Sequence, residues 1–356
     1  MGTRKTLNGE PKVLVYGATG FTGQLILEQL RALRVPFVVA GRNEARLRAV
    51  GEVFRAPVRV FGLEDPGGVE QGLSGVTILL NSAGPFGATT APLIRGCLSA
   101  GVHYLDVSGE VAPLDLASRL DAAAKARGIM VLPAVGFDVV PSDCLAVHLA
   151  RRLPDADELT LSIEGSNLMS RGSALTFAEH AGIPVLARRA GKLEPMRYRA
   201  QMRWTNFGDG ARPTIATSWG DLVTAYHSTR IPNIEVYFEA TPPRILTIGG
   251  NQMFGTSMRP WLRPWFKFLA GMMPEGPSPD VRARHSARIV GEARKGKRRV
   301  RSMLVTREAY SFTGIAAAAV IREVLQGAMA PGFQTPGALF GPDFPLALGA
   351  ERHELS

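Results

Sequence analysis

The sequence predicts an α/β protein with two domains: a parallel sheet covered by helices on both faces, followed by a second, mixed α/β domain. Short and nearly continuous apolar runs alternate with helical patterns over the first 150 residues, as expected for strands buried on both faces. A glycine-rich turn follows the first of these runs. Beyond residue 150, strand-like runs alternate polar and apolar residues, which is typical of a sheet with one face toward water or a pocket.

The first half supplies six candidate strands and four candidate helices. The strands are expected at Lys12–Tyr16, Phe37–Ala40, Val58–Phe61, Val76–Leu80, His103–Val107 and Ile129–Leu132. The helices are expected at Phe21–Leu33, Ala91–Ala100, Pro113–Arg127 and Pro141–Arg152. This order predicts a doubly wound (Rossmann) domain over residues 1–150.

The second half carries fewer and more polar elements. Strands are expected at Glu158–Glu164, Arg197–Trp204, Ile215–Trp219, Glu235–Glu239 and Val300–Thr306, and a helix at Thr313–Gln326. We assign residues 151–330 to a substrate domain, which is also the candidate surface for a homodimer. Residues 331–356 form a C-terminal segment that could pack again on the first domain.

Composition excludes several classes of protein. The chain has 356 residues, of which 46% are hydrophobic and 20% charged, so a mainly disordered chain is excluded. Cys97 and Cys144 are too few for a disulfide framework and favour a reducing compartment. Because no leader-like or membrane-spanning apolar run is present, we expect a cytoplasmic protein. The histidines and cysteines show no metal-ligand spacing, and no metal is expected.

Positive charge is concentrated in the second half. Residues 1–150 hold 14 basic and 13 acidic side chains, whereas residues 151–356 hold 27 and 18. The basic run Arg294–Arg299 is interpreted either as a solvated loop or as a docking site for an acyl-carrier protein or a coenzyme A phosphate. No base-stacking motif accompanies the charge, so nucleic-acid binding is not expected.

The turn after the first strand predicts a dinucleotide-binding loop. Its glycines have the spacing G-x-x-G-x-x-G and stand between a strand and a helix, where main-chain N–H groups and the helix dipole bind a pyrophosphate. A glycine-rich turn without a ligand is the alternative. The predicted cofactor-binding residues of this loop are Gly17, Ala18, Thr19, Gly20, Phe21, Thr22 and Gly23.

Two further segments refine the nucleotide. Arg42 follows the second strand, where its guanidinium can pair with a 2′-phosphate, so NADPH is favoured over NADH. The alternative for Arg42 is a solvated arginine at a helix start. The segment after the fourth strand would line the same crevice, or be an ordinary Gly-Pro turn. The residues predicted there to bind cofactor are Asn81, Ala83, Gly84, Pro85 and Phe86.

These motifs together resemble the saccharopine dehydrogenase-like oxidoreductases, and most closely the trans-acting enoyl reductases of lipid and polyketide pathways. The residues that carry the resemblance are Gly17–Gly23 (GATGFTG), Ala40–Arg42 (AGR), Asn81–Phe86 (NSAGPF), His103–Glu110 (HYLDVSGE), Pro133–Asp143 (PAVGFDVVPSD) and Gly332–Pro336 (GFQTP). The match is dense over residues 12–150 and thin beyond. The resemblance implies NADPH, hydride transfer and a second domain that closes over a substrate cleft.

The loops after the fifth and sixth strands supply the candidate catalytic groups. Glu110 and Asp138 are candidate proton donors if a cleft raises their pKa values. Tyr104 is a third candidate, although its place inside a strand favours packing. The remaining predicted cofactor-binding residues are Ser108, Gly136 and Phe137. In the structural alternative, Asp106 and Asp138 cap helices or tie loops, and Asp143 begins the next helix with Pro141.

Three functions remain open. Reduction of a C=C bond in a carrier- or coenzyme A-bound acyl substrate is favoured by Trp261, Trp265, Phe266 and Phe268. Reduction of an imine formed from an amino acid would instead use convergent arginines, for which the candidates are Arg171, Arg197, Arg199 and Arg203. The third is a nucleotide-binding or membrane-peripheral protein without turnover. The segment Trp261–Met273 could roof an acyl channel, lie in a membrane interface or pack in the core.

Overall fold

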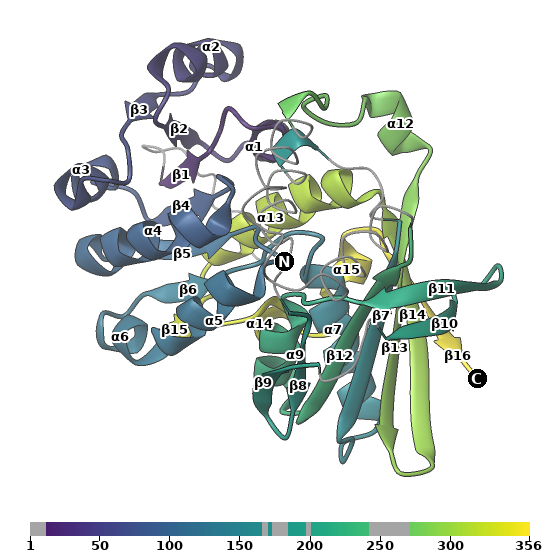
Figure 1. The fold of residues 1–356 in the computed structure, drawn as a ribbon. Coiled ribbons are helices and arrows are strands. Elements are labelled where there is room, and N and C mark those ends of the chain that lie inside the picture. Colours follow the sequence, from purple (N-terminus) through teal and green to yellow (C-terminus); the bar gives the residue numbers. More distant parts are fainter. Residues whose placement is uncertain (1–11, 166–169, 173–183, 197–200, 242–270) are drawn as a thin grey trace, which may run out of the picture.

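The computed structural model describes residues 12–165, 170–172, 184–196, 201–241 and 271–356. Two sheets and their helices make up this part of the chain, with the parallel sheet at the left and the mixed sheet at the lower right (Figure 1). The elements of the parallel-sheet half are β1 (Val13–Tyr16), α1 (Phe21–Ala32), β2 (Phe37–Gly41), α2 (Glu44–Phe54), β3 (Val58–Val60), α3 (Pro66–Gly72), β4 (Ile78–Asn81), α4 (Phe86–Ala100), β5 (His103–Asp106), α5 (Val111–Arg119), α6 (Asp121–Ala126), β6 (Met130–Leu132) and α7 (Val140–Arg152).

The second half of the chain forms the mixed sheet and returns to the first. Its elements are β7 (Glu158–Glu164), β8 (Leu186–Arg189), β9 (Lys192–Pro195), β10 (Met202–Asn206), β11 (Ala211–Ala216), α9 (Asp221–Thr229), β12 (Asn233–Glu239), α12 (Pro279–Ala283), β13 (Ser286–Lys295), β14 (Arg298–Arg307), α13 (Ala309–Leu325), β15 (Gly332–Phe333), α14 (Pro336–Phe340), α15 (Phe344–Ala347) and β16 (Glu351–Leu355).

The first sheet confirms the predicted doubly wound class. Its strands are parallel and follow the order β15-β6-β5-β4-β1-β2-β3, so the order reverses between β1 and β4. Every residue of β1, β2, β4 and β5 is buried, which explains why these strands are almost wholly apolar. The loops after β1 and β4 therefore meet at the switch point, where ligands of such sheets bind.

The second half forms the predicted α/β domain, and its sheet mixes parallel and antiparallel strands. The main path runs β10-β11-β12-β7-β13-β14-β16, in which β12 and β7 are parallel and the other neighbours antiparallel. Helix α7 joins the two halves: nine of its residues are buried, and a Cβ on Gly291 of β13 would lie 2.5 Å from Leu149 of α7. One continuous apolar core therefore reaches from the parallel sheet to the mixed sheet.

The C-terminal part of the chain crosses between the sheets more than once. Helix α13 packs on α1 and places Ala317, Val320 and Ile321 in the core of the parallel-sheet domain, although its sequence position lies inside the range that we assigned to the second domain. Strand β15 extends the parallel sheet beside β6, and β16 then pairs with β14 of the mixed sheet. A single domain boundary in the sequence cannot describe this arrangement, because contacts between residues far apart in the sequence decide on which domain α13 packs.

Several elements differ from the predictions in their bounds or form. Helix α4 begins at Phe86 rather than Ala91, because the Glu110 carboxylate accepts the Phe86 N–H and takes the place of a cap. The expected helix over Pro113–Arg127 is two helices that meet at Leu120. The basic run Arg294–Arg299 is exposed along its whole length, as expected for a solvated segment, and it forms the end of the β13–β14 hairpin around Gly296.

Candidate functional site

The glycine loop after β1 is pressed against the loop after β4. Gly17 has φ +87°, and a Cβ there would lie 2.6 Å from the main-chain nitrogen of Ala83. A Cβ on Gly23 would lie 2.5 Å from the carbonyl oxygen of Gly17. Any side chain at Gly17 or Gly23 would therefore force apart closely packed backbone segments at the switch point, which explains glycine at both positions.

The first turn of α1 is suited to an anion. Gly20 is its N-cap and supplies no capping side chain, and the first turn holds no acidic residue. Ala18 lies in the core beneath the loop, whereas Gly20 is exposed and Thr19, Phe21 and Thr22 are partly so. Unpaired N–H groups at a helix N-terminus bind phosphate oxygens, so these residues fit the pyrophosphate of a dinucleotide.

Arg42 lies directly after β2, where the sequence places the adenosine end of the nucleotide. Its side chain is exposed, and within the described ranges it forms no ion pair. Asn43 caps α2 by accepting the N–H of Arg46. Arg46 in turn forms a 3.1 Å ion pair with Glu275, which lies on the segment leading into α12.

The loop after β4 is shaped by the side chain of Asn81. Asn81 is fully buried, donates to Thr89 and to Tyr104, and accepts the N–H of Ala83. It therefore holds the loop through Ala83, Gly84, Pro85 and Phe86 from below instead of presenting its amide to a ligand. Contact between the loop itself and a cofactor stays a prediction.

Asp106 ties the end of β5 to the loop after β6. It accepts the N–H groups of Ser108 and Ala134 at 2.9 and 2.8 Å and the hydroxyl of Tyr104 at 2.8 Å. Burial raises the pKa of Asp106 to about 6, against these hydrogen bonds. Tyr104 is completely buried, so in this structure its hydroxyl reaches no surface from which it could protonate a substrate.

Glu110 and Ser108 lie at the start of α5, close to α4. The Glu110 carboxylate accepts the Phe86 N–H at 3.1 Å, and the Ser108 hydroxyl accepts the N–H of Glu110 at 3.1 Å. Ser108 is fully buried. Glu110 thus serves as the N-terminal cap of α4, and this use of its carboxylate favours the structural alternative over proton donation.

Asp138 lies in the loop after β6 and is partly exposed. Desolvation by the surrounding protein, with the nearby charge of Glu110, raises the pKa of Asp138 to about 7. A Cβ on Gly109 would meet Asp138 Oδ2 at 2.9 Å and the Trp219 ring at 2.7 Å, so the two loops and Trp219 are in direct contact. Asp138 is the predicted acid that the geometry leaves accessible and close to protonation at neutral pH.

The other residues of that loop support it. Gly136 is buried against Thr313 of α13, whose hydroxyl accepts the N–H of Phe137 at 3.0 Å. Phe137 is 3% exposed and packs edge-on against Phe312. Their predicted contacts with a cofactor stay predictions, because the side chains themselves face the protein.

Two further aspartates lie buried between α7, α9 and the C-terminal segment. Asp143 accepts the hydroxyl of Ser228 and the N–H of Gly337, and burial raises its pKa to about 6. Asp221, at the start of α9, has its pKa raised well above the ordinary value, mainly by burial. Asp143 lies in the first turn of α7 beside Pro141, as the structural alternative expects, and it also ties α7 to α9 and α14.

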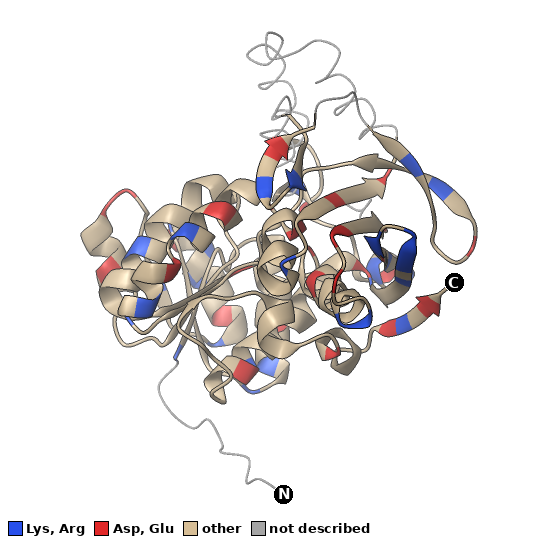
Figure 2. Ribbon diagram, turned by 90° about the horizontal axis from the view of Figure 1, so that it is seen from below, with Lys and Arg blue, Asp and Glu red and all other residues tan. Residues whose placement is uncertain are grey.

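The basic groups of the second half are largely engaged by the protein. Arg171 donates to the carbonyl oxygen of Met273, and Arg203 stacks on Tyr237 with Glu292 at 3.9 Å. The basic hairpin residues pair with acids at Asp155, Asp157 and Glu158. Figure 2 shows basic and acidic segments interspersed over the ribbon. The remaining predicted groups, which lie outside the described residues, are Arg197, Arg199, Trp261, Trp265, Phe266 and Phe268, with most of Trp261–Met273.

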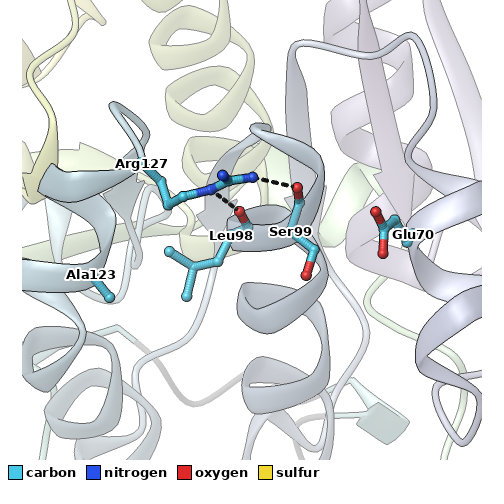
Figure 3. Close-up of a pocket in the computed structure, with 5 residues that line it drawn as sticks. All are labelled: Glu70, Leu98, Ser99, Ala123 and Arg127. Carbon is cyan, nitrogen blue, oxygen red and sulfur yellow. Dashed lines mark hydrogen bonds between the residues drawn. The ribbon is translucent and has the colours of Figure 1, made fainter.

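A shallow hollow elsewhere on the surface is lined by Glu70, Leu98, Ser99, Ala123 and Arg127 (Figure 3). The Arg127 guanidinium donates to the carbonyl oxygens of Leu98 and Ser99, both at 2.7 Å, and so caps the C-terminus of α4. The loop after β4, which holds Pro85 and Phe86, lies at the opposite end of this 15-residue helix, about 20 Å away. The hollow is therefore separate from the glycine loop.

The described part of the chain holds no cluster of three or more metal-ligating side chains. Within the same ranges, none of the helices has the length and apolar character needed to cross a membrane. No signal in the sequence pointed to four residues that lie near the glycine loop or Asp138. These residues are Trp219, Glu275, Gly276 and Arg282. They lie far along the chain and form no motif, so their position depends on the tertiary fold alone.

Comparison with known proteins supports the parallel-sheet domain as a nucleotide site. Residues 13–132 match the family model described as the saccharopine dehydrogenase NADP binding domain. A trans-acting enoyl reductase from Mycobacterium ulcerans (strain Agy99) is 30% identical over 203 residues, which cover 53% of this chain and 47% of that protein. A saccharopine dehydrogenase-like oxidoreductase from Homo sapiens is 26% identical over 161 residues, which cover 40% and 38%.

The matches to these curated relatives span less than half of the relatives' length. In fold, the chain is similar to the apo saccharopine dehydrogenase (L-Glu forming) from Saccharomyces cerevisiae, with a TM-score of 0.63 and 12% identity over 97% of this chain and 99% of that one. These findings confirm the resemblance that the motifs carry. The family match falls on the parallel-sheet half of the chain, over residues 13–132.

Proposed function

We propose that this protein is an NADPH-dependent reductase that reduces the C=C bond of an α,β-unsaturated acyl thioester. The observation that carries the proposal is Asp138: a partly exposed carboxyl with a pKa of about 7, in a loop at the carboxyl end of the parallel sheet. Two relatives at 30 and 32% identity bear the name trans-acting enoyl reductase, which supports this substrate class for the present chain.

The proposed reaction needs one hydride and one proton. A bound NADPH supplies the hydride to the β-carbon, which leaves enolate charge on the substrate carbonyl. Asp138, whose pKa is raised to about 7 mainly by desolvation, gives its proton to the α-carbon and is reprotonated from solvent. The hydride and the proton together would add two hydrogens and two electrons to the C=C bond and give the saturated thioester.

The preference for NADPH over NADH rests on Arg42. Its exposed guanidinium, next to the capped start of α2, is free to pair with a 2′-phosphate. NAD-binding domains place an acidic residue after the second strand to bind the ribose hydroxyls, and this sequence has Arg42 there.

Imine reduction receives less support from the described residues. An enzyme for that reaction holds substrate carboxylates with several convergent cations. Arg171 and Arg203 are instead bound to the main chain of Met273 and to Tyr237. The proposal includes presentation of the acyl substrate by a carrier protein. Lys297 and Arg299 of the β13–β14 hairpin are the candidate docking cations, because within the described ranges no ion pair is found for either.

The test uses NADPH deuterated at C4 and a short enoyl thioester such as crotonyl-coenzyme A. We expect NADPH oxidation at 340 nm, deuterium at the β-carbon of the product, and solvent deuterium at the α-carbon when the reaction runs in D2O. Asp138→Asn should slow turnover and leave NADPH binding intact, whereas Asp115→Asn, at an exposed ion pair with Arg119, should change neither. NADPH oxidation with an amino acid and a 2-oxo acid, but with no enoyl thioester, would overturn the proposal.

A further inference from the structure

A segment of the second half of the chain lies over the first turn of α1. It leads into α12 and passes beside α1 in Figure 1. A Cβ on Gly276 would lie 2.5 Å from the ring of Phe21, the first residue of α1. The edge of Tyr310 packs on the same ring at 5.3 Å. The segment therefore reaches the turn at which the glycine loop offers its N–H groups.

Arg282 of α12 brings a positive charge to this place. Its guanidinium lies 5.8 Å from the centre of the Phe21 ring, and one terminal nitrogen donates to the Ser311 hydroxyl at 3.1 Å. Its Nε is buried and, within the described part of the chain, has no hydrogen-bond acceptor. An unsatisfied buried donor on a charged group costs free energy. The guanidinium as a whole lies over the Phe21 ring at the start of α1, where a bound anion would compensate its charge.

The acids nearby form no direct ion pair with Arg282 in the described part of the chain, although Glu308 accepts the Ser311 hydroxyl to which Arg282 donates. Glu308 begins α13 and accepts the N–H groups of Tyr310 and Ser311. Glu275, on the same covering segment, pairs with Arg46 at 3.1 Å. Over the described ranges, the guanidinium of Arg282 forms no ion pair, while it lies against the residue that opens the predicted pyrophosphate site.

We propose that Arg282 is a pyrophosphate-binding residue of the dinucleotide site, contributed by the segment that leads from the second half of the chain. The inference rests on the nucleotide-binding part of the proposed function and is independent of the reaction catalysed. Because NADPH and NADH share the pyrophosphate, Arg282 should stabilise both, whereas Arg42 should act only on the 2′-phosphate. The two arginines thus divide the recognition of one ligand.

The test is titration of the full chain with NADPH, NADH and adenosine 2′-monophosphate, followed by calorimetry or nucleotide fluorescence. Arg282→Gln should weaken NADPH and NADH alike by about tenfold or more, the loss expected for a charge-assisted hydrogen bond. Adenosine 2′-monophosphate, which lacks the pyrophosphate, should bind the variant as it binds the unaltered chain. Arg284→Gln, two positions along and exposed, is the matched control and should bind all three nucleotides normally.

Two controls distinguish loss of a ligand contact from loss of the fold. They are the Arg282→Lys variant and the melting temperature of Arg282→Gln without nucleotide. The lysine variant should recover part of the affinity, since it keeps the charge. Equal affinity of Arg282→Gln and the unaltered chain for NADPH would overturn the inference and leave the proposed function standing. A parallel loss of adenosine 2′-monophosphate would overturn it in favour of a structural role. If the unaltered chain binds neither dinucleotide, both the proposed function and the inference fail.

Discussion

The indole Nε1 of Trp219 donates a 2.7 Å hydrogen bond to the main-chain carbonyl oxygen of Asp138. Trp219 lies between β11 and α9, and its ring also lies against Gly109, in the loop between β5 and α5. One side chain of the mixed-sheet half thus holds together the two loops that carry the candidate acids. It also contributes to the desolvation that brings the pKa of Asp138 to about 7.

Trp219→Phe should therefore change the pH dependence of the reaction while the chain remains folded. Phenylalanine keeps most of the packing and loses the indole N–H, a loss of about 1 kcal/mol in stability. Water would reach Asp138 more easily, its pKa would fall, and the decline of kcat on the alkaline side would begin at a lower pH. The pH–rate profile and the melting temperature check this, and superimposable profiles would contradict it.

Asp138→Asn should reduce kcat by about two to four orders of magnitude, the usual contribution of a positioned acid. Because the protonated carboxyl is the active form, the rate of the unaltered enzyme should fall as the pH rises through about 7. The asparagine variant should lack that limb. A kcat reduced by less than tenfold, with the alkaline limb retained, would assign proton donation to another group.

Asp138 should also make the stability of the chain depend on pH. Its pKa is raised in the folded state above the ordinary value of 3.8, so the folded state binds more protons than the unfolded state between these values. The contribution to stability is fully present below about pH 4 and is lost as the pH rises through about 7. Chemical unfolding at a series of pH values should show a smaller decline over this window for Asp138→Asn than for the unaltered chain.

Tyr104→Phe separates the structural from the catalytic interpretation of that residue. The change removes the hydroxyl that Asp106 and Asn81 bind inside the sheet, and leaves buried polar groups with fewer partners. We expect a loss of about 1–3 kcal/mol in the free energy of unfolding with kcat unchanged. A large fall in kcat at unchanged stability would show that Tyr104 takes part in the reaction.

The local part of the site was predictable and the rest was not. The glycine spacing and the buried strands of the parallel sheet are set by contacts close in sequence, so pattern alone located the loop from Gly17 to Gly23. The covering of that loop by Gly276 and Arg282, and the contact of Trp219 with Asp138, join residues some 80 to 260 positions apart. The spacing of apolar and polar residues along the sequence does not indicate contacts of this kind. For the same reason the sequence ranges put α13 in the second domain, although it packs on α1 of the first.

Gly23→Ala tests the close approach in the glycine loop. A Cβ would stand 2.5 Å from the Gly17 carbonyl oxygen, a backbone atom that cannot move without shifting β1. We expect lower stability and loss of dinucleotide binding, measured by thermal unfolding and titration. Gly67→Ala in α3, where the nearest side-chain atom would be 3.4 Å away, should leave both unchanged. Retained NADPH affinity in Gly23→Ala would argue against the phosphate-binding role of the loop.

Arg42 and Arg46 should together set the preference for the 2′-phosphate. Arg42→Ala removes an exposed cation and should weaken NADPH by about tenfold or more while NADH changes little. Arg46 follows one helical turn later but is paired with Glu275, and both side chains are more than half exposed. Such a pair contributes about 1 kcal/mol or less, so a 2′-phosphate can displace Glu275. Glu275→Gln should then tighten NADPH by about two- to fivefold and leave NADH unchanged. Equal effects on both nucleotides would show that the two arginines do not read the 2′-phosphate.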